Sequence, residues 1–277
     1  MSTQRRIVST IAGQRAIDGA GVRLIRVVGH SDVKEFDPFL LLDAFDSKDP
    51  KDYTKGFPWH PHRGIETFTY LVEGLIEHGD SLGNKGLIRS GDAQWMTAGS
   101  GIIHQEMPKA SDRMLGLQLW VNLPKKEKMC DPVYRDLTME HMVEIDHEGS
   151  HVRLIAGEYA GRKVNVDQAK VDVRLMDLQM DEGTSLTIDL ETDHTLFLYV
   201  YYGRLQIEGT DVQQRCAVLL GEGDQVTIHS LDASRFMWFQ GKKLKEPIAW
   251  GGPIVMNTRE ELDLAFTQLN QGTFLKR

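Results

Sequence analysis

The sequence lacks the features that mark secreted or membrane-spanning proteins. Its 277 residues contain only two cysteines, Cys130 and Cys216, which lie far apart and outside any Cys-x-x-Cys spacing. This pattern predicts two reduced thiols and neither a disulfide nor a zinc ribbon. The longest apolar runs, such as residues 39–42 and 196–202, fall far short of the roughly 20 residues that cross a bilayer. No apolar segment follows Met1, so we expect a cytoplasmic protein with no membrane partner.

The sequence also lacks a long run of basic residues. The net charge is −8 and the isoelectric point is about 5.7, with acidic and basic residues interspersed along the chain. The densest lysine clusters, at 125–128 and 242–245, fit solvated turns. Direct binding of nucleic acid through a basic face is therefore not expected.

Most of the sequence consists of short segments that favour β-strands. Apolar, β-prone segments recur with glycine or aspartate between them, for example at 22–28, 67–72, 115–121, 152–155, 196–202 and 234–239. Regular short strands with turn residues between them predict an all-β sandwich or barrel. One helix is expected at the C-terminus, where Thr258 and Glu261 form a capping-box pattern before apolar residues at helical spacing, and Gly272 follows as a C′ residue.

A diffuse internal repeat divides the chain. The segment 67–74 leads to Gly91-Asp92, and the similar segment 195–203 leads to Gly223-Asp224. Two units of one design predict two barrels, an N-terminal one over residues 1–135 and a C-terminal one, with the helix, over 136–277.

The candidate chemistry lies in two i, i+2 pairs. His60 and His62 form one pair, and His104 and Glu106 form the other. On extended segments both members of a pair point to the same face, so converging strands would aim three imidazoles and a carboxylate at one point. This donor set suits a divalent transition metal such as iron, manganese, nickel or zinc, and leaves two positions free on an octahedral ion. Alone, the geometry also leaves Glu66 open as a ligand.

The sequence around these pairs resembles the motifs of the pirin family, whose members are built from two cupin barrels. Residues 57–74 are similar to the first pirin motif and 91–108 to the second, and 37–43 and 252–258 extend the likeness toward both ends. The resemblance implies two tandem jelly-roll cupin barrels and one site of His60, His62, His104 and Glu106. Most cupins would use the first-motif glutamate, Glu66, whereas the pirin pattern selects Glu106.

The second half is expected to hold no metal. If Gly223 is aligned with Gly91, Phe236 and Trp238 stand opposite His104 and Glu106, and no cluster of three histidines is available there. We expect Tyr199, Tyr201, Phe236, Trp238 and Phe239 to be core residues. In the first half, Phe57, Trp59, Trp95, Met96 and Trp120 are candidates for an apolar pocket that suits a flat aromatic substrate.

The resemblance implies a function. The first hypothesis is an enzyme, a quercetin 2,3-dioxygenase that uses O2 to cleave flavonols with release of CO, at an iron(II) site in which Glu106 accepts a proton. Manganese, nickel, copper, cobalt and zinc are alternative metals. The second hypothesis is a pirin-type, iron-dependent redox sensor that regulates through protein partners. A metal-free structural protein of the same fold is the third, because one fold hosts unrelated functions.

Overall fold

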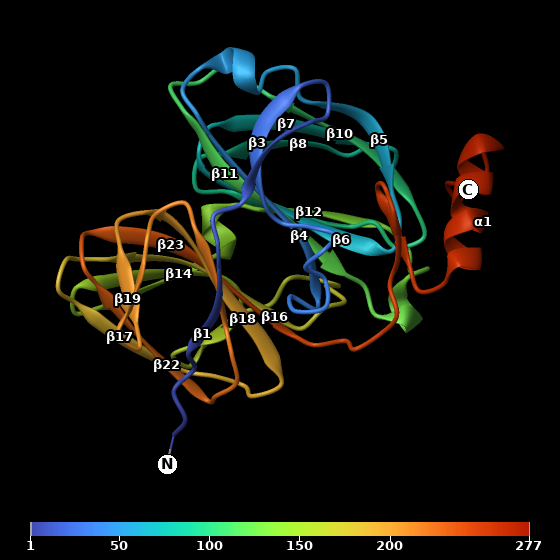
Figure 1. The fold of residues 1–277 in the computed structure, drawn as a ribbon. Helices are drawn as coiled ribbons and strands as arrows, with labels where there is room; N and C mark the ends of the chain where they lie inside the picture. The colour runs from blue at the N-terminus through green and yellow to red at the C-terminus, as the bar shows by residue number, and fades with distance from the viewer. Residues whose placement is uncertain (1, 277) are drawn as a thin grey trace.

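The computed structural model describes residues 2–276 and consists of β-strands with one α-helix, arranged as two barrels (Figure 1). Each barrel is made of a large sheet facing a four-stranded sheet. The prediction of an all-β chain with two tandem barrels and a short C-terminal helix is confirmed. No helix in the described residues has the length and apolar content required to span a bilayer.

The first barrel contains eleven strands in two sheets. The seven-stranded sheet has the order β12 (Val133–Leu137), β9 (Ala93–Thr97), β6 (Ile65–Glu73), β11 (Met114–Asn122), β4 (Phe39–Ser47), β3 (Val22–Val28) and β2 (Gln14–Asp18). The four-stranded sheet has the order β5 (Phe57–His62), β10 (Ile102–Pro108), β7 (Leu75–Asp80) and β8 (Lys85–Arg89). Three 3₁₀ turns interrupt the chain, η1 (Pro50–Asp52), η2 (Lys125–Glu127) and η3 (Met139–His141).

The second barrel repeats this plan. Its large sheet has the order β1 (Ile7–Ile11), β21 (Ala217–Leu220), β18 (His194–Tyr202), β23 (Ser234–Lys242), β16 (Val173–Met180), β14 (Ser150–Tyr159) and β13 (Val143–His147), with β15 (Arg162–Val164) paired to β14. Its four-stranded sheet has the order β17 (Ser185–Asp189), β22 (Gln225–Ser230), β19 (Leu205–Ile207) and β20 (Thr210–Val212).

The largest apolar core lies between the barrels and draws side chains from both large sheets. The rings of Phe197 and Phe239 from the second barrel stack at 4.5 Å, and Phe39 from the first meets Phe197 edge-on at 5.2 Å. Tyr199 and Tyr201 belong to this shared core, whereas Phe236 and Trp238 fill the interior of the second barrel. Because all five expected aromatic residues are buried, that prediction is confirmed.

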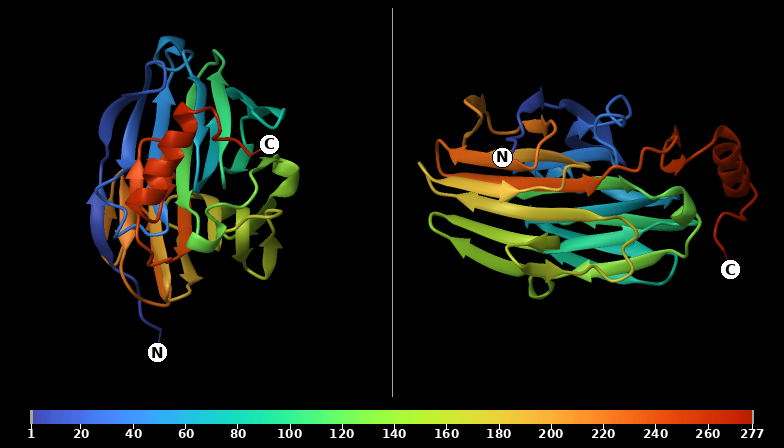
Figure 2. Two further views of the ribbon diagram at one scale, coloured as in Figure 1. Left: turned by 90° about the vertical axis from the view of Figure 1, so that its right-hand side faces the viewer. Right: turned by 90° about the horizontal axis from the view of Figure 1, so that it is seen from below.

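The two ends of the chain cross over. Strand β1 pairs antiparallel with β21 of the second barrel, so the N-terminal segment completes the sheet of the other half. The C-terminal residues form β24 (Ala249–Gly251), β25 (Ile254–Met256) and α1 (Arg259–Asn270), which lie against the first barrel (Figures 1 and 2). The predicted division at residue 135 stays a prediction. Residue 135 itself lies in β12 of the first barrel, and β1 and the segment after β23 lie against the barrel of the other half.

The predicted helix is confirmed in detail. Thr258 is the N-cap of α1, and its hydroxyl accepts a hydrogen bond from the backbone N–H of Glu261 while the Glu261 carboxylate accepts one from the Thr258 backbone N–H. Leu262 and Ala265 are the helix residues whose side chains are buried. Gly272 follows with φ of +70°, the left-handed conformation that a glycine adopts without strain.

Candidate metal centre

The inner faces of β5 and β10 carry the three predicted histidines. The two strands are antiparallel, and His60 stands directly opposite His104 while His62 stands opposite Ile102. Side chains alternate along each strand, so all three imidazoles enter the barrel. A bulge follows, because Phe57 rather than Pro58 faces Glu106, and this extra residue in β5 turns both Phe57 and Pro58 toward the cavity.

The structure brings His60, His62 and His104 together. One nitrogen from each ring lies within 4.8 Å of the others. The ring centroids are 4.3 Å apart for His60 and His104, 4.8 Å for His60 and His62, and 5.0 Å for His62 and His104. His62 and His104 are almost fully buried, at 2% and 1% exposure.

The hydrogen bonds of these rings fix which nitrogens carry hydrogen. His60 Nδ1 lies 2.9 Å from the Pro58 carbonyl oxygen, and His62 Nδ1 lies 3.1 Å from the Pro253 carbonyl oxygen. A carbonyl only accepts, so each Nδ1 donates and each Nε2 keeps a lone pair. The two Nε2 atoms are 3.1 Å apart, and both nitrogens of His104 are buried without a hydrogen-bond partner. Lone pairs facing one another in this way fit a shared cation.

Burial keeps these rings neutral. Desolvation lowers the pKa of His60, of His104, and of His62 to about 3, with the neighbouring histidines adding to the effect on His62 and His104. A neutral imidazole is the form that binds a metal. The group therefore has the protonation state and the converging lone pairs of a metal site, and both nitrogens of His104 lack a hydrogen-bond partner.

Glu106 lies in the same cavity but outside the three-histidine group. Its carboxylate accepts a hydrogen bond of 3.0 Å from the Thr69 hydroxyl, which also lies 2.6 Å from Gln118 Oε1. Burial raises the pKa of Glu106 to about 7, with the Thr69 hydrogen bond opposing that shift. Its role as the fourth ligand stays a prediction.

Glu66 lies on the opposite face of the sheet. Strand β6 turns Thr69 toward Glu106, and therefore turns Glu66 to the other side, as alternation requires. There the Glu66 carboxylate accepts hydrogen bonds of 2.5 Å from the Thr97 hydroxyl and 3.3 Å from the Lys170 backbone N–H. A contact between Glu66 and a cation held by the three histidines would require β6 to reverse its faces.

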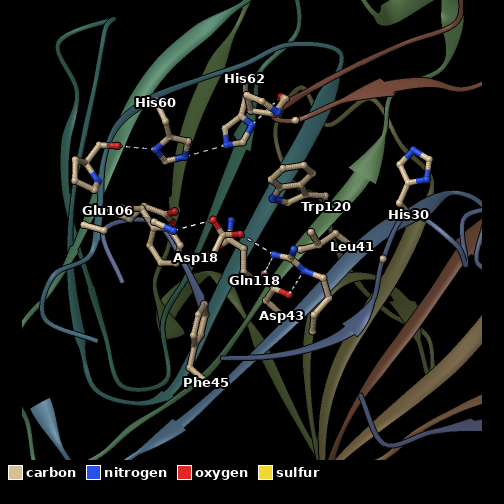
Figure 3. Close-up of a pocket in the computed structure, with 18 of the residues that line it drawn as sticks. Asp18, His30, Leu41, Asp43, Phe45, His60, His62, Glu106, Gln118 and Trp120 are labelled. Carbon is tan, nitrogen blue, oxygen red and sulfur yellow. Dashed lines mark hydrogen bonds and ion pairs between the residues drawn. The ribbon is translucent and has the colours of Figure 1, made fainter. Parts of the chain in front are cut away.

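A cavity of about 720 Å³ opens beside the histidines. Figure 3 shows His60 and His62 next to each other, Glu106 below them, and the Trp120 ring beside His62. The ring centroids of His62 and Trp120 are 4.9 Å apart. Apolar side chains line much of the cavity, chiefly Leu41, Phe45, Phe57, Trp120, Trp250 and Pro253. Its polar wall contains Asp18, Arg26, Asp43 and Gln118.

The predicted aromatic pocket is correct in part. Phe57 and Trp120 line the cavity. Trp59 alternates with the inward-facing His60 and is 55% exposed at the surface. Trp95 and Met96 are fully buried in core clusters, and the residues that line the cavity include none from β9.

Two contributions to the site were missed from the sequence. His78 was interpreted as an ordinary histidine, yet it is buried on β7 with its ring centroid 5.3 Å from that of His104, and Gln94 Nε2 lies 2.7 Å from its Nδ1. Its i, i+2 spacing to Asp80 was the available signal. The second contribution is the segment with Trp250 and Pro253, for which no local signal exists.

The second barrel has apolar residues at the equivalent positions. Strand order puts β17 and β22 where β5 and β10 stand in the first barrel. There Leu186 pairs with Ile228 and Ile188 pairs with Val226, and all four side chains are buried in one apolar cluster. No polar atom from these four side chains is available to a cation.

The alignment of the internal repeat was wrong in one respect. Placing Gly223 on Gly91 set Phe236 and Trp238 opposite the residues of β10. In the structure these two aromatics lie on β23, which occupies the position of β11, while β22 occupies the position of β10. The Gly-Asp turns therefore precede different strands in the two barrels, β9 in the first and β22 in the second.

Comparisons with known proteins agree with this architecture. Residues 21–121 match the family model Pirin, and 175–275 match that of the pirin C-terminal cupin domain. A Pseudomonas aeruginosa protein, provisionally named a quercetin 2,3-dioxygenase, is 41% identical over 98% of this chain and 99% of its own length. Human pirin is 38% identical over 96% of this chain and 92% of its own.

A solved structure agrees as well. Quercetin 2,3-dioxygenase from Acinetobacter baumannii matches with a TM-score of 0.90 and 31% identity, covering 98% of this chain and 99% of that one. Family models match both halves, and near-complete relatives exceed 30% identity. The chain therefore belongs to the pirin family, and its two barrels are cupin domains.

Proposed function

We propose that this pirin is a metal-dependent dioxygenase that cleaves flavonols such as quercetin with O2 and releases CO. The observation that carries the proposal is the convergence of three neutral, buried imidazoles beside a largely apolar cavity of about 720 Å³. This volume lies within the range of about 300–1,000 Å³ that is usual for small-molecule sites. Relatives whose names refer to quercetin 2,3-dioxygenase support the substrate class.

We infer that His60, His62, His104 and Glu106 hold the metal, with iron(II) the favoured ion. The unpartnered nitrogens of His104 and the facing Nε2 atoms of His60 and His62 support this set. When bound, a divalent metal supplies a Lewis acid that stabilises a deprotonated enol or catechol oxygen and allows O2 to meet the ring.

Glu106 is the proton acceptor in this proposal. It lines the cavity next to the histidines, and its pKa of about 7 is close to the value at which a general base works best near neutral pH. Thr69 orients the carboxylate through its hydroxyl, and Gln118 contacts the same hydroxyl from the cavity wall. The three side chains hold the proton-accepting oxygen where a substrate hydroxyl enters.

The walls of the cavity favour a flat ring. The ring centroids of Trp120 and Trp250 are 5.9 Å apart, and the angle between the ring planes is 41°. Phe57, the first residue of β5, also faces the cavity. Aromatic side chains bind planar rings through offset and edge contacts. Arg26 is already paired with Asp43 at 2.8 and 2.9 Å and with Asp18 at 2.7 Å, so this wall carries more negative than positive charge. A phosphorylated substrate is therefore disfavoured.

The test is CO release. Protein loaded anaerobically with iron(II) and then given quercetin in air should consume O2 and produce CO, while a His104→Ala variant should produce none. Because the variant removes one imidazole and leaves the cavity walls in place, it separates metal-dependent turnover from adventitious oxidation. Absence of CO at every metal stoichiometry would contradict the dioxygenase proposal.

A second candidate is a redox-sensing regulator that acts through a protein partner. The feature that favours it is Trp59, which neighbours His60 in β5 and is 55% exposed, so a change at the metal lies one residue from the surface. Capture of a partner by the ferrous but not the ferric protein would support this function. Equal capture by both forms would contradict it.

A further inference from the structure

The C-terminal strap, residues 249–274, reaches the metal centre from the far end of the chain. The chain leaves the second barrel after β23 and crosses to the first barrel. There β24, β25 and α1 of the strap lie beside β5 (Figures 1 and 2). Trp250, Gly252 and Pro253 of the strap line the cavity. The site is therefore incomplete without a segment that follows the entire second barrel.

One strap atom contacts a predicted metal ligand directly. The Pro253 carbonyl oxygen lies 3.1 Å from His62 Nδ1, and it fixes the ring so that Nε2 faces His60. His60 obtains the same control from Pro58, two residues away in its own strand. His62 is thus the histidine of the three whose orientation depends on a residue distant in the sequence.

The residue after His62 anchors the strap. The Arg63 carbonyl accepts a hydrogen bond of 3.1 Å from the Val255 N–H. Its guanidinium, with the residue 3% exposed, donates to Gln268 Oε1 at 2.7 Å and to the Phe274 carbonyl at 2.8 Å. It also lies 4.1 Å from the centre of the Phe274 ring. If the strap moved, a buried charge would lose two of its acceptors and its aromatic contact.

Lys128 makes a second clasp on the strap. Its ammonium is buried, and it donates to the carbonyls of Gly64 at 2.8 Å and Val255 at 2.9 Å and to the Asn122 side chain. Three donors thus meet three acceptors without a carboxylate. The Arg63 carbonyl and the Lys128 ammonium both hold Val255 of β25, while the Arg63 guanidinium holds the later residues Gln268 and Phe274.

We propose that Arg63 and Lys128 are positioning residues of the metal centre, and that they act on His62 through the strap and the Pro253 carbonyl. Strap docking and metal binding are then linked, and each strengthens the other by the same factor. The proposal rests on the metal centre of the proposed function but on no step of its reaction. It predicts that a substitution outside the ligand set changes metal affinity.

The chain offers a matched control for Arg63. Arg5 is 1% exposed and donates to three backbone carbonyls, those of Gly223 at 2.9 Å, His194 at 2.8 Å and Glu191 at 2.7 Å. It thereby pins the N-terminal segment to the second barrel, just as Arg63 pins the C-terminal strap to the first. Replacing either arginine by lysine keeps the charge and removes the fork-shaped donor geometry.

The experiment measures cobalt(II) binding to the full-length protein, by chelator competition and by the visible absorption bands of the bound ion. Arg63→Lys should weaken affinity about 10- to 100-fold, the usual range for residues that orient a ligand, and should shift the bands. Arg5→Lys should lower the melting temperature while leaving affinity and bands unchanged. Equal affinity in the two variants would overturn the proposal, and so would wild-type protein that binds no cobalt.

Hydrogen exchange of the wild-type protein provides a second measurement if Arg63→Lys does not fold. Adding cobalt(II) should slow exchange of the Val255 amide, which is bonded to Arg63, by at least several-fold. The Arg5 amide, bonded at 2.7 Å to the Gln225 carbonyl in the second barrel, should be unaffected. Equal protection of both amides, or of neither, would overturn the link. CO release enters neither experiment, so failure of the proposed reaction would leave this result standing.

Discussion

The hydroxyl of Tyr70 connects the two barrels at the centre of their shared core. It donates a hydrogen bond of 2.6 Å to Asp177 Oδ2 across the junction, and Arg153 donates to it at 3.1 Å. Arg235 also pairs with Asp177 from the neighbouring strand. Burial and the nearby carboxylate raise the pKa of Tyr70, so the phenol keeps its proton and remains a donor.

Removing this hydroxyl should cost about 2 kcal/mol. A hydrogen bond to a charged group contributes roughly 1.5–3 kcal/mol, and both Tyr70 and Asp177 are buried, at 0% and 2% exposure, so water cannot replace it. Tyr70→Phe keeps the ring and therefore the packing of the core. At about 2–4 °C per kcal/mol for a chain of this size, the melting temperature should fall by roughly 4–8 °C.

The assay is denaturant unfolding of Tyr70→Phe beside Tyr201→Phe. The Tyr201 hydroxyl is also buried in the shared core but has no hydrogen-bond partner among the described residues, so its removal should be neutral or stabilising. A cycle with Asp177→Asn should give a coupling of about 1.5 kcal/mol or more for Tyr70. Equal effects of the two tyrosine substitutions would refute the reasoning.

Three further predictions concern the centre and the surface. A saturating divalent metal, at about 100 times its dissociation constant, should stabilise the wild-type protein by about 2.7 kcal/mol in thermal unfolding and have no effect on His104→Ala. Glu66→Gln should retain one cobalt(II) per chain by elemental analysis, because the side chain faces away from the histidines, whereas Glu106→Gln should weaken binding; the reverse result would exchange their roles. The hydrogen bond with Asp146 raises the pKa of the half-exposed His151, so this pair stabilises the fold below pH about 6.5 and loses its effect as pH rises through the raised pKa. The effect should be no more than a few tenths of a kcal/mol, and a His151→Gln variant with an unchanged stability–pH slope between pH 6 and 8 would contradict it.

Local patterns predicted the parts of this protein that depend on local geometry. The i, i+2 spacing of His60 and His62 was sufficient to put both rings on one face, because strand alternation has a fixed period of two. The capping residues of α1 likewise interact within a single turn, so Thr258 and Glu261 marked its start correctly.

Long-range pairing could not be predicted in the same way. Pro253 reaches His62 across 191 residues of separation, and nothing in the spacing of either segment encodes that contact. The pairing of β1 with β21 is equally remote in sequence. The repeat was aligned incorrectly because Gly-Asp turns occur before many strands, whereas strand identity is set by hydrogen-bonded neighbours that the sequence does not reveal.

The crossing of the two ends gives the halves a mutual dependence. A chain cut between β12 and β13 yields an N-terminal piece that carries β1, an edge strand for the other barrel, and a C-terminal piece that carries Trp250, Gly252 and Pro253 of the cavity lining. The C-terminal piece then lacks one strand of its own large sheet and exposes the edge of β21, while the N-terminal piece lacks part of the cavity lining. Split in this way, the two fragments restore the complete second sheet and the full cavity lining only when they associate.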